Sequence, residues 1–380
     1  MPGTKVESAA AAGVLAVAAR PVRIEEIGGW REFLQLREVW RRLAASDADG
    51  VLLGHDWVVQ SWKCCAELGQ GERPCVLGLR GGDGWEGFVA LRHNRRTRRL
   101  CFLDEQRSQR LDLLGRPDGR GWELVAKYLL SRRDWDRLDL FYLREPSARA
   151  IADTWPGWGL AVRERGRVVQ RWVDLRRPWR EVEADFSLYL RANMRRRYKR
   201  LQAHGAVELQ EFSRRPDLMS ALEECFALEK RGWKGANGTA VLDDANLHRF
   251  YRQLAARLAG RGEFRLFCLR VGERLAAFEY CVADRNAQRL NSLKIAYAEE
   301  LRTASPGVVL RWLLLQRVQG EFAAYDFLGD DAPWKGEWTP QVTELRHLRV
   351  FNRTLRGQMW RWRAQAWAVI RGDRSGRVLG

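Results

Sequence analysis

Apolar positions in the first half of the chain change between the spacing of a strand and that of a helix. After a short strand they recur every three to four residues over 30–44, which predicts a helix with one buried face. Two later apolar runs, joined by Gly81-Gly82-Asp83-Gly84, predict a β-hairpin. The expected elements are a strand at 23–27, helices at 30–44 and 58–68, hairpin strands at 75–79 and 87–91, strands at 111–114 and 138–143, and a helix at 122–131. This half therefore mixes α and β in a single sheet.

The second half repeats this plan, although it does not repeat the residues. Its long first helix ends at Gly205, a residue suited to helix C-termini. The expected elements are helices at 179–204, 217–230 and 306–318, and strands at 207–212, 265–270, 275–282, 289–297 and 324–328. We expect a disordered leader at 1–20, two α/β halves with mixed sheets at 21–175 and 176–350, and a basic Trp/Arg-rich helix and tail at 351–380.

Length and composition indicate a globular protein. A chain of 380 residues suits about two domains. Hydrophobic residues make up 46% and charged residues 30%, which excludes both wholesale disorder and a bundle of membrane spans. The alanine-rich stretch 9–19 is shorter than a membrane-spanning helix, and Glu7 precedes it where a signal peptide carries positive charge. We expect a cytoplasmic protein, at most peripheral at the inner face of the membrane.

The net charge of +18 favours anionic partners, such as a phosphate-bearing metabolite, an acidic membrane or nucleic acid. Arginine is spread along the chain beside many acidic residues, so a solvated Arg-rich surface is the simpler interpretation. The seven cysteines include no C-x-x-C pair, and the five histidines are scattered. This pattern suggests neither a disulfide framework nor a metal site.

Ser305-Pro306-Gly307 lies where a strand gives way to a helix. We expect Ser305 to cap the free backbone N–H groups and Pro306 to occupy the first helical position. The amides and the positive dipole end of such a helix suit a pyrophosphate, although an ordinary helix start has the same residues.

Three further segments carry charge beside aromatic rings. Trp233-Lys234-Gly235, with Gly238, predicts a loop that either gates a substrate or simply ends a helix. Residues 191–200 form a basic helix, which suits a phosphate-rich partner but is also typical of a solvated face. Within 353–371, one face of a predicted helix carries an apolar stripe of Leu355, Met359, Trp362, Ala366 and Ile370. We expect this stripe to pack on the parent domain, and contact with a membrane interface is the alternative.

Several blocks, taken in order, resemble the bacterial CelD/BcsL-like acetyltransferase family. That family is related to the FemAB-type aminoacyltransferases and belongs to the GNAT superfamily. The matching blocks are His55-Asp56-Trp57 with Trp62, the basic helix 191–200, Trp233-Lys234-Gly235 with Gly238-Thr239-Ala240, Lys294 to Pro306-Gly307, and Asp326-Phe327 through Lys335 and Trp338. The resemblance implies tandem GNAT-like domains, with acyl-CoA between the splayed strands 289–297 and 324–328.

The resemblance also implies a set of site residues. The pyrophosphate would lie on the amides of the 306–318 helix, although Arg302–Gly307 departs from the superfamily's usual Q/R-x-x-G-x-G/A string. The expected cofactor-binding residues are Ser305, Pro306, Gly307 and Val308. The expected substrate-binding residues are Trp233, Lys234, Gly235, Lys294 and Trp338. No metal is expected.

Direct acyl transfer needs a base for the acceptor's proton and a donor for the leaving thiolate. Glu299 and Asp326 are the base candidates, and Tyr297 or Tyr325 could protonate the thiolate. Lys335, like Lys294, could hold a phosphate or carboxylate. Because side chains alternate along a strand, Lys294 and Tyr297 should face opposite ways unless the strand is bulged.

The leading hypothesis is transfer of an acyl group, with acetyl-CoA the expected donor. The acceptor would be an amine or hydroxyl of a small molecule or an envelope or exopolysaccharide precursor. A FemAB-like aminoacyltransferase that binds aminoacyl-tRNA is one rival, and a non-catalytic scaffold is the other. The first half has no S-P-G-like turn, so the cofactor is expected in the second half.

Overall fold

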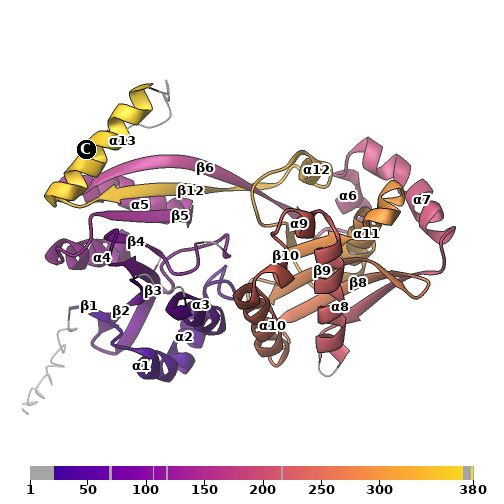
Figure 1. Cartoon of the computed structure of the whole chain (residues 1–380), viewed down its shortest axis with the longest axis horizontal. Helices are drawn as coiled ribbons and strands as arrows, with labels where there is room; N and C mark the ends of the chain where they lie inside the picture. The colour runs from indigo at the N-terminus through magenta and orange to yellow at the C-terminus, as the bar shows by residue number, and fades with distance from the viewer. Residues whose placement is uncertain are drawn as a thin grey trace, which may run out of the picture.

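The computed structural model describes residues 21–67, 71–105, 107–116, 119–214, 217–370 and 378–379. The predicted leader at 1–20 lies outside them. One mixed sheet runs through the molecule in the order β1-β2-β3-β4-β5-β12-β6-β11-β10-β9-β8-β7, and β13 pairs with β6 (Figure 1). The mixed α/β fold expected from the sequence is confirmed.

The first half contains β1 (Arg23–Glu26), α1 (Trp30–Gln35), α2 (Arg37–Ala44), α3 (His55–Glu67), β2 (Glu72–Gly81), β3 (Gly84–Asn94), β4 (Arg99–Phe102), α4 (Gly119–Ser131), β5 (Arg137–Arg144), α5 (Glu145–Thr154), the 3₁₀ turn η1 (Trp155–Trp158) and β6 (Ala161–Asp174). Strands β1 to β4 form an antiparallel meander, and α4 then returns the chain to the parallel partner β5.

The remaining elements are α6 (Trp179–Ala184), α7 (Leu188–Gln202), β7 (Val207–Phe212), α8 (Asp217–Arg231), α9 (Trp233–Ala236), η2 (Val241–Asp243), α10 (Ala245–Ala259), β8 (Phe264–Val271), β9 (Arg274–Asp284), β10 (Arg289–Tyr297), η3 (Glu299–Ala304), α11 (Pro306–Val318), β11 (Ala324–Asp326), α12 (Pro333–Gly336), β12 (Val342–Phe351), α13 (Leu355–Ile370) and β13 (Val378–Leu379). The plan of the first half recurs, with β7 to β10 as the meander and α11 leading to the parallel strand β11.

Two long strands join the halves. Strand β6 pairs with β12 through residues 161–171 and then with β11 through residues 172–174. Strand β12 follows the second half in sequence but lies between β5 and β6, as the two long ribbons of Figure 1 show. Residues 342–350, which we assigned to the second half, therefore belong to the strand that completes the sheet of the first.

The hydrophobic core also crosses between the halves. Val51, Leu52 and Trp57 belong to the same buried cluster as α8, α10 and α11 of the second half. The Trp57 ring meets Phe250 of α10 edge to face, with 5.8 Å between ring centroids. Helix α3 thus packs on both halves and holds them together.

A buried arginine occupies the junction. Arg110 donates to Gln170 Oε1 on β6 at 3.0 Å, to Asp49 Oδ1 at 3.2 Å and to Asp326 Oδ2 on β11 at 2.5 Å. Burial opposes its charge, but Asp326 and Asp49 outweigh that effect and raise the pKa of Arg110. Arg289 of β10 adds a second cation 3.2 Å from Asp49.

Four predicted elements differ from the structure. Leu36 divides the helix expected at 30–44, and Ser187 begins a new helix inside 179–204 because its Oγ accepts from Leu190 N at 3.1 Å. Residues 111–114 make only isolated bridges instead of a strand. Strand β11 ends at Asp326, two residues before the predicted end.

The stripe on α13 does not pack on the parent domain as we expected. Leu355 is 88% exposed, Met359 60% and Trp362 70%, and Ala366 is exposed as well. The side chain of Ile370 lies outside the described residues. The other side of α13 contacts β5 and β6, where the Arg137 guanidinium lies over the Trp360 ring. The stripe is therefore available to a partner.

No helix among the described residues is long and apolar enough to cross a membrane. Those residues also contain no cluster of His, Cys, Asp and Glu side chains that could hold a metal ion.

Replacing Arg110 by Met should lower the free energy of unfolding by about 3–5 kcal/mol, because it removes the buried cation that joins Asp49 to Asp326. The measurement is urea denaturation followed by tryptophan fluorescence. Arg176→Met, which breaks the exposed pair with Asp174, is the control and should leave the free energy of unfolding nearly unchanged. Equal effects would show that the junction does not depend on Arg110.

Candidate active site

A cavity of about 440 Å³ opens in the second half. It lies between β10 and α11, with one wall from the α9 turn and another from α12. The lining residues are Trp233, Lys234, Phe278, Glu279, Ile295, Ala296, Tyr297, Arg302, Ser305, Pro306, Gly307, Val308, Leu310, Arg311, Trp334, Glu337 and Trp338. Its size falls in the range of small-molecule sites.

The cavity exists because two parallel strands separate. β10 and β11 pair only from Arg289–Asn291 with Ala324–Asp326, after which β10 continues alone on this side. A bulge between Ser292 and Lys294 bends β10 just beyond the last paired residue. On the side away from β9, the backbone of Ile295 and Ala296 therefore lies beside the cavity instead of beside another strand.

The N-terminus of α11 forms the rim. Ser305 adopts the left-handed conformation (φ 56°, ψ 56°), and its carbonyl accepts from the N–H groups of Val308 and Val309 at 3.1 and 3.2 Å. Its side chain does not cap the helix, contrary to our expectation, because the backbone itself makes the turn. Pro306 starts the helix as predicted. A Cβ on Gly307 would lie 3.8 Å from the Tyr297 ring, so this glycine faces the cavity.

A buried charged network supports the wall. Glu279 Oε2 accepts from Tyr325 OH at 2.6 Å and from Ser292 Oγ at 3.1 Å, and Arg311 Nη2 lies 2.6 Å from Oε1. The Arg311 guanidinium also lies over the Trp334 and Trp338 rings, at 4.7 and 5.6 Å. Sequence analysis missed Glu279 and Arg311. The signal that could have identified them is that each is the only charged residue in an apolar run, Glu279 in 275–283 and Arg311 in 307–315.

Tyr297 and Glu299 lie together at the cavity mouth. Burial, together with the nearby Glu299 carboxylate, raises the pKa of Tyr297, so its phenol stays protonated at neutral pH. A Cβ on Gly232 would lie 3.9 Å from Glu299 Oε1, which places this carboxylate beside the turn that carries Trp233. The pair can therefore present one proton donor and one proton acceptor.

A second charged cluster lies behind β10. Lys234 donates to Glu229 Oε1 at 2.7 Å and to the Ile295 carbonyl at 2.9 Å, so the α9 turn is tied to the strand. Lys294 faces away from Tyr297, as alternation predicted, because the bulge precedes it. Its ammonium lies 4.7 Å from the centre of the Tyr251 ring, and burial lowers its pKa to about 8.

Residues 190–336 match the family model described as "Acetyltransferase (GNAT) domain". The match lies within the second half of the chain and includes most of the residues that line the cavity. A search of curated proteins finds no significant match to the chain. The finer CelD/BcsL-like resemblance stays a prediction.

Solved structures share the whole two-part fold. FemX has a TM-score of 0.57 at 9% identity, over 86% of this chain and 97% of FemX. The C-terminal domain of a putative lysylphosphatidylglycerol synthetase from Agrobacterium fabrum gives 0.52 at 14%, over 84% and 93%. A conserved Bacteroides thetaiotaomicron protein of unknown function gives 0.52 at 10%, over 84% and 97%. At these identities the likeness shows the fold alone.

The GNAT domain brings together only part of the predicted site. Ser305, Pro306, Gly307, Val308, Tyr297, Trp233, Lys234 and Trp338 line the cavity, and Glu299 lies at its mouth. Asp326 instead joins the Arg110 network, and Lys335 donates to the carbonyls of Leu328 and Asp330. Trp233–Ala236 forms a one-turn helix rather than the expected loop, and Gly235 packs tightly on Lys230 O.

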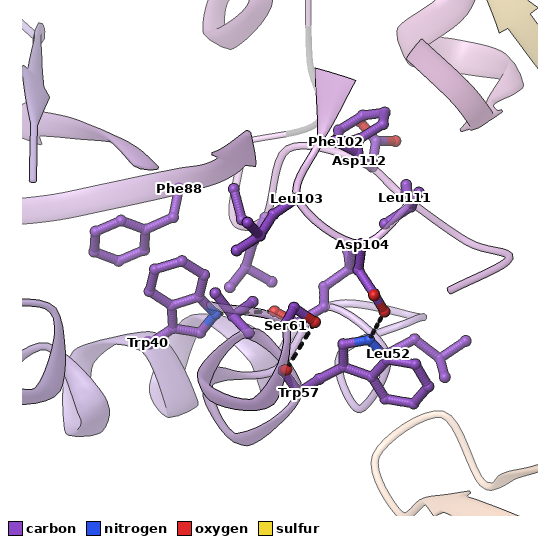
Figure 2. A pocket seen from close by; sticks show the side chains of 14 residues that line it. Trp40, Leu52, Trp57, Ser61, Phe88, Phe102, Leu103, Asp104, Leu111 and Asp112 are labelled. Carbon is purple, nitrogen blue, oxygen red and sulfur yellow. Dashed lines mark hydrogen bonds between the residues drawn. The ribbon is translucent and has the colours of Figure 1, made fainter. Parts of the chain in front are cut away.

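The matching position in the first half is filled by the chain itself. Beyond the short β4–β5 pairing, Leu111 bridges to Leu143 of β5 and Leu114 to Phe88 of β3. Asp112 is fully buried there and accepts from Ser147 Oγ at 2.7 Å. The adjoining cavity measures about 30 Å³, about the size of one water (Figure 2). Among the described residues, this position of the first half therefore offers no space comparable to the cavity of the second half.

The walls of this small cavity show why it is closed. Figure 2 shows Trp57 turned toward Asp104, whose Oδ2 accepts from its indole nitrogen at 2.5 Å. Trp40 stacks on Phe88 with 4.3 Å between ring centroids. The first half has therefore used its equivalent space to build a core.

Replacing Lys294 by Met should stabilise the protein at pH 7, because folding then no longer has to desolvate an ammonium. The stability gain of the variant should shrink between about pH 8 and 10.5. In this range Lys294 loses its proton in the folded wild type but keeps it in the unfolded chain, so the stability of the wild type rises with pH. Urea denaturation at pH 7 and pH 10 measures this difference. Lys199→Met on α7 controls for loss of a surface lysine, and a constant Lys294→Met effect would contradict the prediction.

Proposed function

We propose that the protein transfers an acyl group from acyl-CoA, with acetyl-CoA the expected donor, to an amine or hydroxyl. The acceptor is a small molecule or an envelope or exopolysaccharide precursor. The observation that carries the proposal is the open cavity between β10 and α11, beyond the point where β10 and β11 separate. The GNAT domain match over 190–336 supports the same reaction class.

The donor's pyrophosphate would lie on the first turn of α11. Pro306 has no N–H, and those of Val308 and Val309 bond to the Ser305 carbonyl, so the Gly307 N–H is the donor that would meet the phosphate, where the helix dipole favours an anion. Gly307 lets the phosphate approach the backbone, and the exposed Arg302 lines the same rim. The thioester arm would then follow β10 at Ile295 and Ala296 into the cavity, beside the Ile295 carbonyl that Lys234 binds.

The acceptor would enter beside the α9 turn. Glu299 is suited to take the proton from its amine or hydroxyl as that group attacks the thioester carbon. When the tetrahedral intermediate collapses, Tyr297 can protonate the departing thiolate, because its phenol is held in the protonated form. Lys234, fixed by Glu229 and the Ile295 carbonyl, would position the turn that carries Trp233.

Isothermal titration with acetyl-CoA should detect binding to the wild type. Gly307→Asp should weaken it at least about tenfold, because a carboxylate would repel the pyrophosphate at the rim. The control is Gly157→Asp, on an exposed turn of the first half with open space around it. Equal losses in both variants would show a general defect. A wild type that binds aminoacyl-tRNA but no CoA ester would instead indicate an aminoacyltransferase.

We also propose that α13 contacts the surface of an anionic membrane. Its exposed apolar stripe, Leu355, Met359 and Trp362, is accompanied by Arg356, Arg361 and Arg363, and residues 353–366 contain no acidic side chain. Aromatic and aliphatic groups beside arginines suit the interface of an acidic bilayer. Such contact would bring the enzyme to a lipid-linked acceptor.

Vesicles of phosphatidylglycerol should sediment with the wild type, and vesicles of phosphatidylcholine should do so much less. The double variant Met359→Glu, Trp362→Glu should lose this binding, because it places two carboxylates in the stripe. Leu242→Glu, at a partly exposed site on η2, serves as the control. A concentration-dependent dimer that the double variant abolishes, without vesicle binding, would assign the stripe to a second copy of the chain.

A further inference from the structure

Helix α7 carries a positive charge that the structure does not neutralise. Its six basic side chains are Arg191, Arg195, Arg196, Arg197, Lys199 and Arg200, and the helix contains no acidic residue. Within the described residues none of the six forms an ion pair, whereas arginines across both halves pair with carboxylates, such as Arg144 with Asp112 and Arg270 with Glu224. The general Arg-rich composition therefore does not account for α7.

This arrangement opposes helix stability. Arg191 and Arg195, and likewise Arg196 and Arg200, stand four residues apart, where like charges repel. The helix dipole favours cations only in the last turn, so it compensates Lys199 and Arg200 but not the earlier arginines. Such a concentration of charge is typical of a surface that meets an anion.

The C-terminal end of α7 reaches the proposed phosphate turn. Arg200 Nη1 donates to the carbonyl of Thr303 at 3.3 Å, and Thr303 lies two residues before Ser305. Arg196 precedes Arg200 by one helical turn and is also exposed. Arg302, next to Thr303, lines the cavity rim. Figure 1 shows α7 and α11 at the same end of the molecule.

The N-terminal part of α7 faces a different space. Arg191 and Arg195 line a groove of about 360 Å³ between α7 and α11, together with Glu183 of α6, which forms no ion pair with either arginine among the described residues. The other lining residues are Met194, Tyr198, Val309, Trp312, Leu313 and Gln316. Arg196 and Arg200 do not line that groove. The same helix thus offers two pairs of cations in different surroundings, of which only one adjoins the η3 turn.

We propose that Arg196 and Arg200 of α7, together with Arg302 of η3, bind the 3′-phosphate of the coenzyme A donor. This inference rests on the proposed function, since it places the nucleotide end of the same ligand. With the pyrophosphate on the first turn of α11, the ribose 3′-phosphate is the next anionic group along the molecule. Three guanidinium groups suit a doubly charged phosphate monoester, to which they can donate several charge-assisted hydrogen bonds.

The test compares coenzyme A with dephospho-coenzyme A, which lacks only the 3′-phosphate. Isothermal titration should show that the wild type binds coenzyme A at least about tenfold more tightly. In the double variant Arg196→Gln, Arg200→Gln, this preference should fall to near unity, while the affinity for dephospho-coenzyme A stays within about threefold of the wild-type value.

A matched variant separates a local site from the overall field. Arg191→Gln with Arg195→Gln removes the same charge from the same helix but on the groove side, and it should retain most of the preference. Equal loss in both double variants would overturn the assignment in favour of long-range attraction. Circular dichroism of each variant excludes unfolding of α7.

The remaining outcomes distinguish this inference from the proposed function. Equal affinities of the wild type for the two ligands would overturn the 3′-phosphate site and leave acyl-CoA binding intact. Binding of neither ligand would overturn both proposals. If the wild type binds RNA with steep salt dependence and α7 variants weaken that binding, then the helix serves a nucleic acid instead.

Discussion

The junction around Arg110 is the constraint on which the rest of the structure depends. Its guanidinium bridges a loop of the first half, β6 and β11, and it is held by carboxylates that have little access to water. Such a network tolerates few other geometries, because each charge must keep its partner. It fixes β11 at the point where β11 leaves β10, and this separation opens the cavity.

The two halves use one plan for different ends. In each half a helix connects two parallel strands, β4 to β5 or β10 to β11, and the two strands separate after a short pairing. The first half fills the space beyond the paired strands with residues 111–114, which include the buried Asp112, and with a tryptophan-rich core. It therefore contributes stability and a continuous sheet. The second half leaves the space open and lines it with ionisable groups, of which Glu279, Arg311 and Lys234 have fixed partners. An enzyme needs only one open site, and the closed half gives that site a rigid support.

Charge is distributed in a way that the composition conceals. Most arginines outside α7 neutralise nearby carboxylates, including those that join the halves. The uncompensated cations of α7 adjoin the α11 turn, and those of α13 lie beside an exposed apolar stripe. Anions of two kinds, a nucleotide and a lipid surface, would thus meet opposite ends of the molecule (Figure 1).

The sequence by itself determined the local elements and many of the residues that line the cavity. Alternating and helical spacings gave the meander strands, the β10 strand and the α11 helix, and Ser305-Pro306-Gly307 marked the turn that lines the cavity, because these patterns act within a few residues. Only the tertiary structure decided the rest. It placed β12 in the first half, moved Asp326 and Lys335 away from the cavity, and brought Glu279 and Arg311 together beneath it. Those outcomes depend on pairing between strands distant in sequence and on the partners that buried charges find there, which no local pattern specifies.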